Sequence, residues 1–441
     1  METLDFAVIS LGVLAFALVS GRLVNSAITP PMVFVAFGLL IGPYGLGIAA
    51  IDLDADLIRA LAELTLILVL FTDAARIDVG RLRRDHTLPV RLLAIGLPLT
   101  FLLGVALAWP LFVGFGLITG SLTAGLVQAA LIAAVLAPTD AALGQLVVVA
   151  EQVPARVRQA LNVESGLNDG LTLPLVLLLI AMAVSAQGEA AGGFEFWARF
   201  VGLQLTVGPL VGAAVGFFGG LVVDRAARAQ WMTLAFQGLS ALGLALIAYA
   251  AAELCGGNGF ISAFVAGLVM GATKRSVCGY LFDFAETQGQ LLTLLTFMIF
   301  GAVMVPRAIL ALDGPALLPV VVYALLSLTV IRMGPVALAL WSKRLRRESI
   351  VFMGWFGPRG LASILFALLV LQHGVVADDG IFLPVVVVTV LFSVILHGLS
   401  AAPGVAWYGT VAKAFMHADP GCPEQRSITE LPTRVGRGIL N

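Results

Sequence analysis

The chain has 441 residues and a net charge of -1; 60% of the residues are hydrophobic and only 12% are charged, with a mean hydropathy of +1.03. Soluble domains carry about 25% charged residues, so this composition excludes a soluble protein and indicates an all-α polytopic membrane protein. The near-neutral charge argues against nucleic acid as a partner. Three cysteines and four scattered histidines show no spacing typical of a metal or haem site, so we expect no cofactor.

Apolar stretches of about 17 residues or more, the length that crosses a bilayer, predict about thirteen transmembrane helices. They lie near residues 5–21, 31–49, 57–74, 88–110, 118–150, 158–186, 197–223, 231–252, 257–273, 288–306, 315–341, 349–372 and 381–403. The stretch 118–150 is long for one helix, and Pro138 interrupts it. We therefore predict a transmembrane domain over residues 1–403 and a short polar tail, 404–441, which we expect to be flexible.

Alternate loops of this arrangement differ in charge. One set carries most of the basic residues: Arg22, Arg76, Arg81, Arg83, Arg84, Arg156, Arg158, Arg225, Arg228, Lys274, Arg275, Lys343, Arg344, Arg346 and Arg347. The other set carries mainly acids, among them Asp52, Asp54, Glu189, Glu253 and Asp379. Basic loops remain in the cytoplasm, which predicts the N-terminus outside and the C-terminal tail inside. Small loops and the lack of a targeting signal favour a bacterial inner membrane.

Charged or helix-breaking residues interrupt the apolar pattern at four places. These are Ala137-Pro138-Thr139-Asp140, Glu164-Ser165-Gly166-Leu167-Asn168-Asp169, Arg332 and Gly357-Pro358-Arg359-Gly360. A charge at the centre of a span costs roughly 2.5–3.5 kcal/mol, so we expect these sites to have a function. The alternative for the second of them is a loop or helix cap outside the membrane core.

The two proline breaks fall in the fifth span of each predicted half of the chain. Broken helices in corresponding halves are typical of a transporter built from inverted repeats, with the binding site between the breaks. Each break presents partial positive charge at helix N-termini and partial negative charge at C-termini. Asp140 can offset the first and Arg359 the second; the alternative is that either side chain reaches water at the interface.

Glu164 needs a partner if it stays ionised, and Arg332 is the other unassigned buried base, so we predict a structural ion pair. Asp169 then has no predicted counter-charge. Burial disfavours the charged form of a carboxyl group, so Asp169 should hold either a proton or a cation, and the two compete for the same oxygens.

Thr139, Ser165 and Asn168 can complete an oxygen shell around a hard cation, with Asp169 and Thr139 as direct ligands of Na⁺. Because Asn168 is neutral, one ionisable group serves the site. This favours the exchange of one cation for one proton.

At these residues the chain resembles the sodium/proton exchanger family, specifically its NhaP/NHE-like branch of monovalent cation–proton antiporters. The matching motifs are Pro138-Thr139-Asp140, Glu164 to Asp169, Ile331-Arg332-Met333-Gly334-Pro335, Gly357 to Gly360, and Leu396-His397-Gly398-Leu399-Ser400. The resemblance implies an NhaA-like antiporter fold with two broken, crossing helices. It also implies a homodimer in which a core, near 88–186 and 315–403, moves against a dimerisation scaffold.

The resemblance further implies that the ion lies at Asp169 and the Thr139-Asp140 break, so Asp140 is also expected among the ion- or proton-binding residues. It implies that the Glu164–Arg332 pair fixes Asn168, and that an Asn-Asp pair accompanies electroneutral exchange. Two residues depart from the family pattern. Ala141 stands where a proline is usual, and Gly166 where a bulkier residue is usual.

The sequence therefore predicts a secondary-active Na⁺/H⁺ antiporter, also accepting Li⁺, that works by alternating access and serves pH homeostasis. A K⁺/H⁺ antiporter of the same mechanism is the first alternative, and a gated cation channel is the second. A channel needs a continuous polar path, whereas the polar residues here cluster at mid-depth. No nucleophile–base pair or cofactor motif indicates an enzyme.

Overall fold

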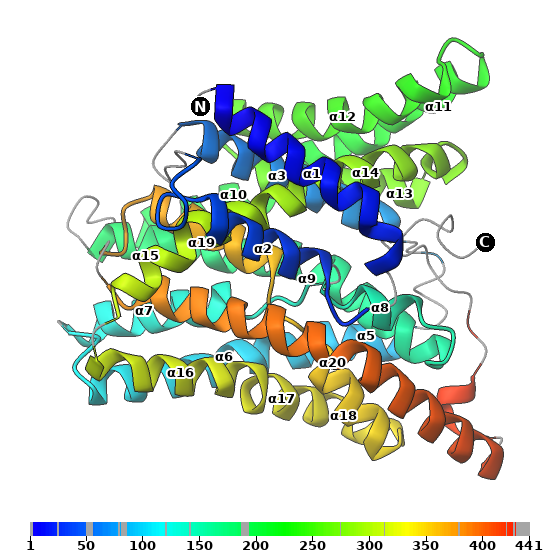
Figure 1. Ribbon diagram of the computed structural model, residues 1–441. Coiled ribbons are helices and arrows are strands. Elements are labelled where there is room, and N and C mark those ends of the chain that lie inside the picture. The colour runs from blue at the N-terminus through cyan, green and yellow to red at the C-terminus, as the bar shows by residue number, and fades with distance from the viewer. Residues whose placement is uncertain are drawn as a thin grey trace.

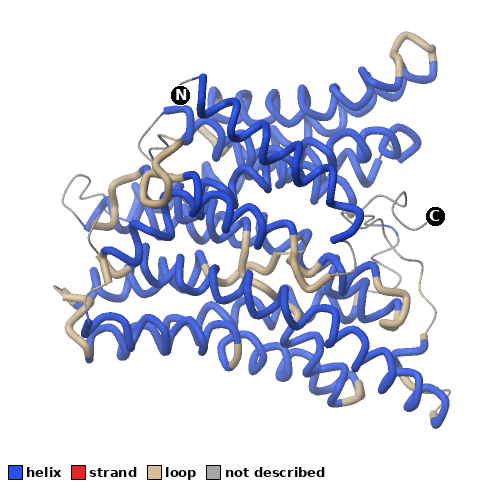
Figure 2. The backbone as a smooth tube through the Cα atoms, in the orientation of Figure 1, coloured by secondary structure: helices blue, strands red, loops and turns tan. Residues whose placement is uncertain are grey.

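The computed structural model describes residues 3–23, 26–49, 56–77, 80, 86–119, 121–140, 143–186, 194–273, 275–312, 314–377, 380–419, 421–426 and 428. Within these ranges every regular element is a helix (Figure 2). The all-α prediction is therefore confirmed for this part of the chain. Ala141 and several of the predicted loop charges, such as Asp52, Arg81 and Glu189, lie outside the described residues.

Each predicted span coincides with a helix or a helical stretch (Figure 1). The first half contains α1 (Thr3–Leu23), α2 (Pro30–Ile41), α3 (Asp56–Arg76), α5 (Thr87–Arg91), α6 (Leu97–Gly114), α7 (Leu122–Val135), α8 (Gln145–Val149) and α9 (Ala155–Ala186). The second half contains α10 (Phe194–Ala214), α11 (Gly220–Arg228), α12 (Leu234–Leu254), α13 (Gly259–Thr273), α14 (Arg275–Ile299), α15 (Val305–Leu310), α16 (Gly314–Leu328), α17 (Val330–Leu340), α18 (Arg347–Trp355), α19 (Leu361–Gln372) and α20 (Phe382–Ala418). π-helical turns at Leu92–Gly96, Val215–Gly219 and Phe300–Met304 join α5 to α6, α10 to α11 and α14 to α15.

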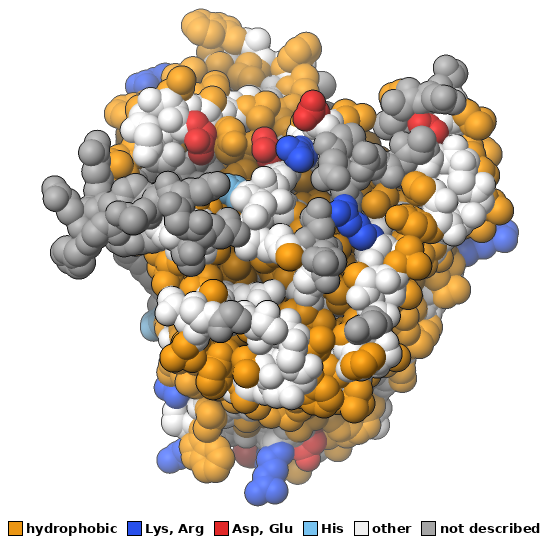
Figure 3. Space-filling view, turned by 90° about the vertical axis from the view of Figure 1, so that its left-hand side faces the viewer, with side chains coloured by type: hydrophobic (Ala, Val, Ile, Leu, Met, Phe, Trp, Pro, Cys, Tyr) orange, Lys and Arg blue, Asp and Glu red, His pale blue; other side chains and the backbone are white. Residues whose placement is uncertain are grey.

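Helix length and composition match a bilayer. Within the described residues, eight helices are long and apolar enough to cross a membrane, and four shorter apolar helices accompany them. A further helix, α3, has 21 residues but includes charged ones along its length. On the face shown in Figure 3, hydrophobic side chains predominate and charged ones are few. The protein is thus a multi-pass membrane protein.

The helices form two groups, which occupy the upper and lower parts of Figure 1. In the scaffold group, α13 packs against α3, α10 and α12, while α14 packs against α2 and α12. In the site group, α7 packs against α6 and α9, α17 against α16 and α18, and α20 against α16 and α19. Contacts of α3 with α9 and α19 join the groups. The site group covers the residue ranges predicted as the core.

Small residues let the scaffold helices approach closely. A Cβ atom added to Gly267 or Gly271 of α13 would lie 2.9 Å or 2.8 Å from the carbonyl carbon of Phe71 or Ala75 in α3. The two glycines are four residues apart and share one helix face. Such spacing is typical of membrane helices whose backbones touch.

Both predicted breaks interrupt helices in the structure. The first break lies between Val135, where α7 ends, and Gln145, where α8 begins; the second lies between Trp355 of α18 and Leu361 of α19. Each contains a proline, and the residue before a proline avoids the α conformation. The breaks appear as non-helical segments near the middle of the molecule in Figure 2.

Up to residue 426, the described part of the C-terminal tail differs from the flexible segment that the sequence predicts. The last helix, α20, continues to Ala418, and a 3₁₀ turn at Pro423–Gln425 packs against the start of α9. Glu424 is 1% exposed, and its Oε1 accepts hydrogen bonds from the Arg346 amide (2.7 Å) and the Ser349 hydroxyl (2.8 Å). Arg156 Nη1 also donates to the Pro423 carbonyl (2.7 Å). The tail therefore caps the first turn of α18 and ties it to α9.

We predict that Glu424→Ala destabilises the protein by about 1–3 kcal/mol, because it leaves a buried amide and hydroxyl without their acceptor. The measurement is the thermal unfolding midpoint in detergent. Glu424→Gln keeps an acceptor oxygen and should stay closer to wild type, and Gln425→Ala, at an exposed neighbour, should change nothing. A Glu424→Ala midpoint equal to that of Gln425→Ala would show that the cap contributes no stability.

Candidate ion-binding site

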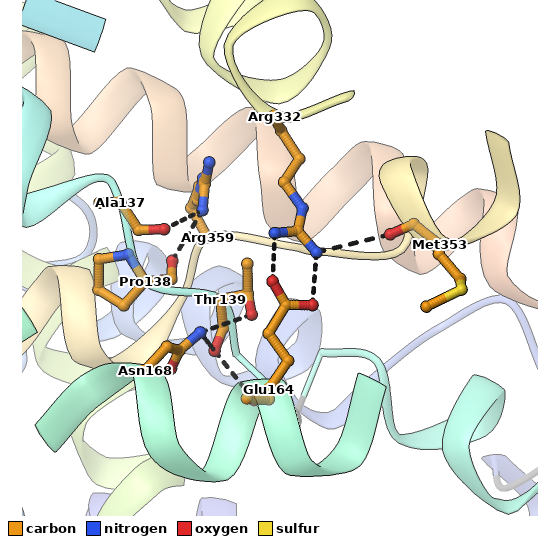
Figure 4. Close-up of polar contacts among 9 residues, drawn as sticks. Ala137, Pro138, Thr139, Glu164, Asn168, Arg332, Met353 and Arg359 are labelled. Atoms are coloured by element: carbon orange, nitrogen blue, oxygen red, sulfur yellow. Dashed lines mark hydrogen bonds and ion pairs between the residues drawn. The ribbon is translucent and has the colours of Figure 1, made fainter. Parts of the chain in front are cut away.

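The two breaks contact each other, and each carries a charged side chain that offsets partial charge at the helix ends of the other. The Asp140 amide donates to the Pro358 carbonyl (2.8 Å), and the Asp140 carboxylate Oδ2 accepts from the Leu361 amide at the start of α19 (2.7 Å). In the opposite direction, Arg359 Nη1 donates to the carbonyls of Ala137 (2.5 Å) and Pro138 (3.0 Å) just beyond α7 (Figure 4).

A carboxylate thus faces a helix N-terminus and a guanidinium faces carbonyls at a helix C-terminus, which is the favourable arrangement at both ends. Asp140 and Arg359 are 4% and 0% exposed. The alternative that these charges reach interface water is wrong.

Glu164 and Arg332 form a buried, two-point ion pair. Arg332 Nη1 lies 2.5 Å from Glu164 Oε1, and Nη2 lies 2.8 Å from Oε2 (Figure 4). Each residue is 2% exposed. A Cβ atom at Gly357 would lie 2.6 Å from the Arg332 Cζ atom, so the second break needs glycine there to let the guanidinium pass. Glu164 lies well inside α9, which rules out the loop or cap alternative for this stretch.

Two side chains of α9 donate hydrogen bonds to Thr139 in the first break. Ser165 Oγ donates to the Thr139 carbonyl (2.9 Å). Asn168 Nδ2 donates to Thr139 Oγ1 (2.7 Å) and to the Thr139 carbonyl (3.2 Å) (Figure 4). Because a carbonyl can only accept, the Asn168 amide nitrogen must face Thr139. The Asn168 Oδ1 atom then points elsewhere and has no hydrogen-bond partner among the described residues.

Asp169 lies one helical turn beyond Ser165 and is 6% exposed. It takes part in at least one interaction with another residue. That it lacks a counter-charge stays a prediction. This turn of α9 and the first break together carry a carboxylate, hydroxyls, an amide oxygen and backbone carbonyls.

This donor set suits a hard cation. No group of three or more His, Cys, Asp or Glu side chains that could hold a metal ion occurs in the part of the chain that the structure describes. The candidate site instead combines neutral oxygens with a carboxylate. Such a site can exchange its occupant, since the carboxylate accepts either a proton or a cation.

Gly166 faces the end of α3. A Cβ atom at this position would lie 3.4 Å from Ile77 Cδ1 and 3.8 Å from the Asp73 carbonyl oxygen. These are ordinary van der Waals distances, so the backbone leaves room for a Cβ atom, and the structure gives no steric reason for the departure from the family pattern at Gly166.

A second polar cluster supports the second break, and sequence reasoning did not assign it a role. The Arg359 amide donates to Ser393 Oγ (2.7 Å), which lies 3.2 Å from His397 Nδ1. His397 Nε2 lies 2.9 Å from the Trp355 carbonyl, and the two rings stack. Trp355 Nε1 donates to Ser400 Oγ (2.9 Å). A neutral imidazole with its proton on Nε2 donates to the Trp355 carbonyl, and its Nδ1 accepts from the Ser393 hydroxyl. The Ser393 carbonyl, 3.0 Å from Nδ1, receives no proton from the ring in this tautomer.

The signal for this cluster is the spacing of Ser393, His397 and Ser400 along an otherwise apolar helix. Residues at i, i+4 and i+7 share one face. That face holds the last carbonyl of α18 and the first amides of the break, groups that a membrane helix cannot leave unsatisfied.

Comparisons with known proteins fit this geometry. The family model "Sodium/hydrogen exchanger, transmembrane" matches residues 7–407. The K⁺/H⁺ antiporter NhaP of Alkalimonas amylolytica is 26% identical over 412 residues, covering 92% of this chain and 67% of that protein. The K⁺/H⁺ antiporter NhaP2 of Shewanella baltica (strain OS223) is 23% identical, covering 84% and 60%. The Na⁺/H⁺ antiporter of Schizosaccharomyces pombe is 22% identical, covering 63% and 64%.

The chain thus spans 60% to 67% of the length of these three relatives. Among solved structures, the sodium proton antiporter MjNhaP1 of Methanocaldococcus jannaschii shares the fold with a TM-score of 0.71. Its sequence is 18% identical, and the match covers 93% of this chain and 98% of that one.

We predict that Glu164→Gln destabilises the protein by about 3–5 kcal/mol, because it leaves the Arg332 guanidinium buried without its counter-charge. The double variant Glu164→Leu/Arg332→Met should recover much of the loss, since no buried charge remains. Thermal unfolding in detergent measures both.

The matched control is Asp419→Asn, which removes a pair with Arg346 in which both side chains are exposed (3.8 Å; 48% and 51%). Exposed pairs contribute about 0–1 kcal/mol. Equal unfolding midpoints for Glu164→Gln and Asp419→Asn would contradict a structural role for the buried pair.

Proposed function

Because the chain belongs to the sodium/hydrogen exchanger family, we propose that it is a secondary-active antiporter that exchanges one monovalent cation for one proton. The predicted family and the predicted antiporter fold are both confirmed. This family consists of transporters, so the chain is not an enzyme.

The observation that carries the proposal is the convergence of α9 on the first break. Ser165 and Asn168 hold Thr139 through three hydrogen bonds, and Asp169 is buried on the same helix. A cation near Asp169 would find oxygens of Asp169 and Thr139 as ligands. When the cation leaves, burial favours protonation of the carboxylate. Competition for the same oxygens is sufficient to couple the movement of the cation to the movement of the proton.

The proposed stoichiometry follows from Asn168. Its amide donates to Thr139 and cannot take up a proton, so Asp169 is the titratable group at the exchange position. Exchange of one monovalent cation for one proton moves no net charge. The supporting residues have structural roles: Asp140 and Arg359 offset the partial charges of the helix ends, and the Glu164–Arg332 pair anchors α9 to α17.

Na⁺ is the proposed cation, with Li⁺ accepted and K⁺ as the alternative. The hard oxygen donors suit all three. The S. pombe relative and the archaeal structure are named for sodium, whereas the two bacterial relatives are named for potassium. A gated cation channel is the remaining alternative, but the described polar groups concentrate at the crossing of the breaks, which favours an occluded site.

Alternating access would move the site group against the scaffold group. Both breaks, the ion pair and the His397 cluster lie within the site group, so they can move as one body while the contacts of α3 with α9 and α19 change. We further propose that the protein forms a homodimer through the scaffold group. It would lie in a bacterial inner membrane, with the N-terminus outside and the C-terminus in the cytoplasm.

We predict that Asp169→Asn abolishes cation-driven proton movement. The measurement uses purified protein in sealed liposomes with an internal pH dye, imposed Na⁺ or K⁺ gradients and the membrane voltage clamped at zero. Asp419→Asn, which changes an exposed carboxylate, should transport like wild type. Full activity of Asp169→Asn would move the exchange site to another group. A wild-type current that reverses at the cation equilibrium potential would indicate a channel.

Competition also fixes the sign of the pH dependence. As pH falls on the side from which the cation enters, protons occupy the carboxylate more often, so the apparent KM for the cation should rise while the maximal rate at saturating cation stays constant. Initial rates over a range of cation concentrations, with pH varied on that side and held constant on the other, test this. If lowering the pH reduced the maximal rate and left the KM for the cation unchanged, the result would contradict a site shared by proton and cation.

A further inference from the structure

The oxygen-bearing face of α9 extends one turn beyond the residues that the sequence singled out. Ser165, Asn168, Asp169 and Thr172 follow the spacing i, i+3, i+4 and i+7. At about 100° per residue they fall within an arc of roughly 100°, with Thr172 within about 60° of each of the others. Their backbone is helical throughout.

The opposite side of α9 is occupied by packing. A Cβ atom at Gly170 would lie 2.6 Å from the Phe264 ring of α13, and Gly166 faces the end of α3. Thr172 therefore lies on the side of the helix that faces Thr139 and the first break, and not on the side that packs against the scaffold.

The Thr172 hydroxyl is buried and has no hydrogen-bond partner among the described residues; the residue is 2% exposed. A helical threonine ordinarily satisfies its hydroxyl by donating to the carbonyl four residues earlier. Thr65, Thr72, Thr296 and Thr389 do so here, at 2.6–2.9 Å. An unsatisfied buried polar atom in a folded protein calls for an explanation, such as an absent ion or water.

A second such atom lies one turn away. Asn168 Oδ1 is buried without a hydrogen-bond partner in the described part of the chain, and Asn168 and Thr172 are neighbours on the helix surface. Two neutral oxygens of the type that binds hard cations thus adjoin the Asp169 carboxylate. Neither can be protonated at physiological pH, so neither can take part in the proton half of the exchange.

We propose that Thr172 supplies a hydroxyl oxygen to the transported cation, one turn of α9 beyond Asp169, and thereby sets cation affinity without affecting proton affinity. This rests on the exchange function proposed above. The helical rise from Asp169 to Thr172 is about 4.5 Å. Na⁺ is similar in size to Ca²⁺, for which metal–oxygen distances are about 2.3–2.6 Å. Two oxygens on opposite sides of such a cation therefore lie about 5 Å apart.

The test compares wild type, Thr172→Val, Thr172→Ser and Thr100→Val in sealed liposomes. Valine has nearly the shape of threonine but no hydroxyl, whereas serine keeps the hydroxyl. Thr100 of α6 is the matched control, because it is also 2% exposed and its hydroxyl also has no partner in the described residues. The readouts are the apparent KM for Na⁺ and K⁺, the maximal rate and the pH profile.

For Thr172→Val we expect the apparent cation KM to rise about tenfold, with a maximal rate within about twofold of wild type. Because protons then compete more effectively, its activity profile should move to higher pH. Thr172→Ser should retain the wild-type KM, and Thr100→Val should leave both KM and the pH profile unchanged.

Three results would overturn the inference: a wild-type KM in Thr172→Val, a Thr172→Ser variant as impaired as Thr172→Val, or an equal KM shift in Thr100→Val. An impaired Thr172→Ser variant would assign the KM change to packing. An equal KM shift in Thr100→Val would assign it to the loss of any buried hydroxyl. Stabilisation of the detergent-solubilised variants by Na⁺ on heating gives a readout independent of transport. A wild type without cation-driven proton movement would refute the exchange function itself, whereas an active wild type with a normal Thr172→Val refutes only the role of Thr172.

Discussion

A helix interrupted at membrane depth exposes amides and carbonyls that lipid cannot satisfy, and the rest of this structure depends on how two such interruptions satisfy each other. Arg359 of the second break donates to the Ala137 and Pro138 carbonyls of the first. Asp140 of the first break accepts from the Leu361 amide of the second. Each break therefore carries the charge that the other requires, and neither could persist at this depth alone.

These reciprocal hydrogen bonds between the breaks also fix the position of the candidate ion site. Thr139 sits between Pro138 and Asp140, both fixed by the second break, so its carbonyl and hydroxyl are held where Ser165 and Asn168 reach them. The fixed Thr139 in turn determines which way the Asn168 amide points. The neutral side chains of the candidate site thus gain a defined geometry from the charged contacts between the breaks, in line with the general role of supporting contacts around a bound cation.

Much of this architecture could be predicted from the sequence, because charge is conspicuous in an apolar chain. The spans, both breaks and the Glu164–Arg332 pair follow from the cost of burying a charge. Which groups meet in the fold is harder to predict: the spacing of Ser393 and His397 marks a polar helix face but does not show that this face supports the second break. Glu424 is charged, yet only the folded chain shows that it meets the amide of Arg346, 78 positions away, so the described part of the tail differs from the flexible segment that the sequence predicts.

The buried acids have different surroundings, which supports the proposal that one carboxylate serves two ions. The oxygens of Glu164 are occupied by the Arg332 guanidinium, and an Asp140 oxygen accepts from the amide at a helix N-terminus. In the proposed exchange these two acids hold the helices and the two breaks in place. Asp169, buried on the same helix as Glu164, is then the carboxylate for which a cation and a proton compete.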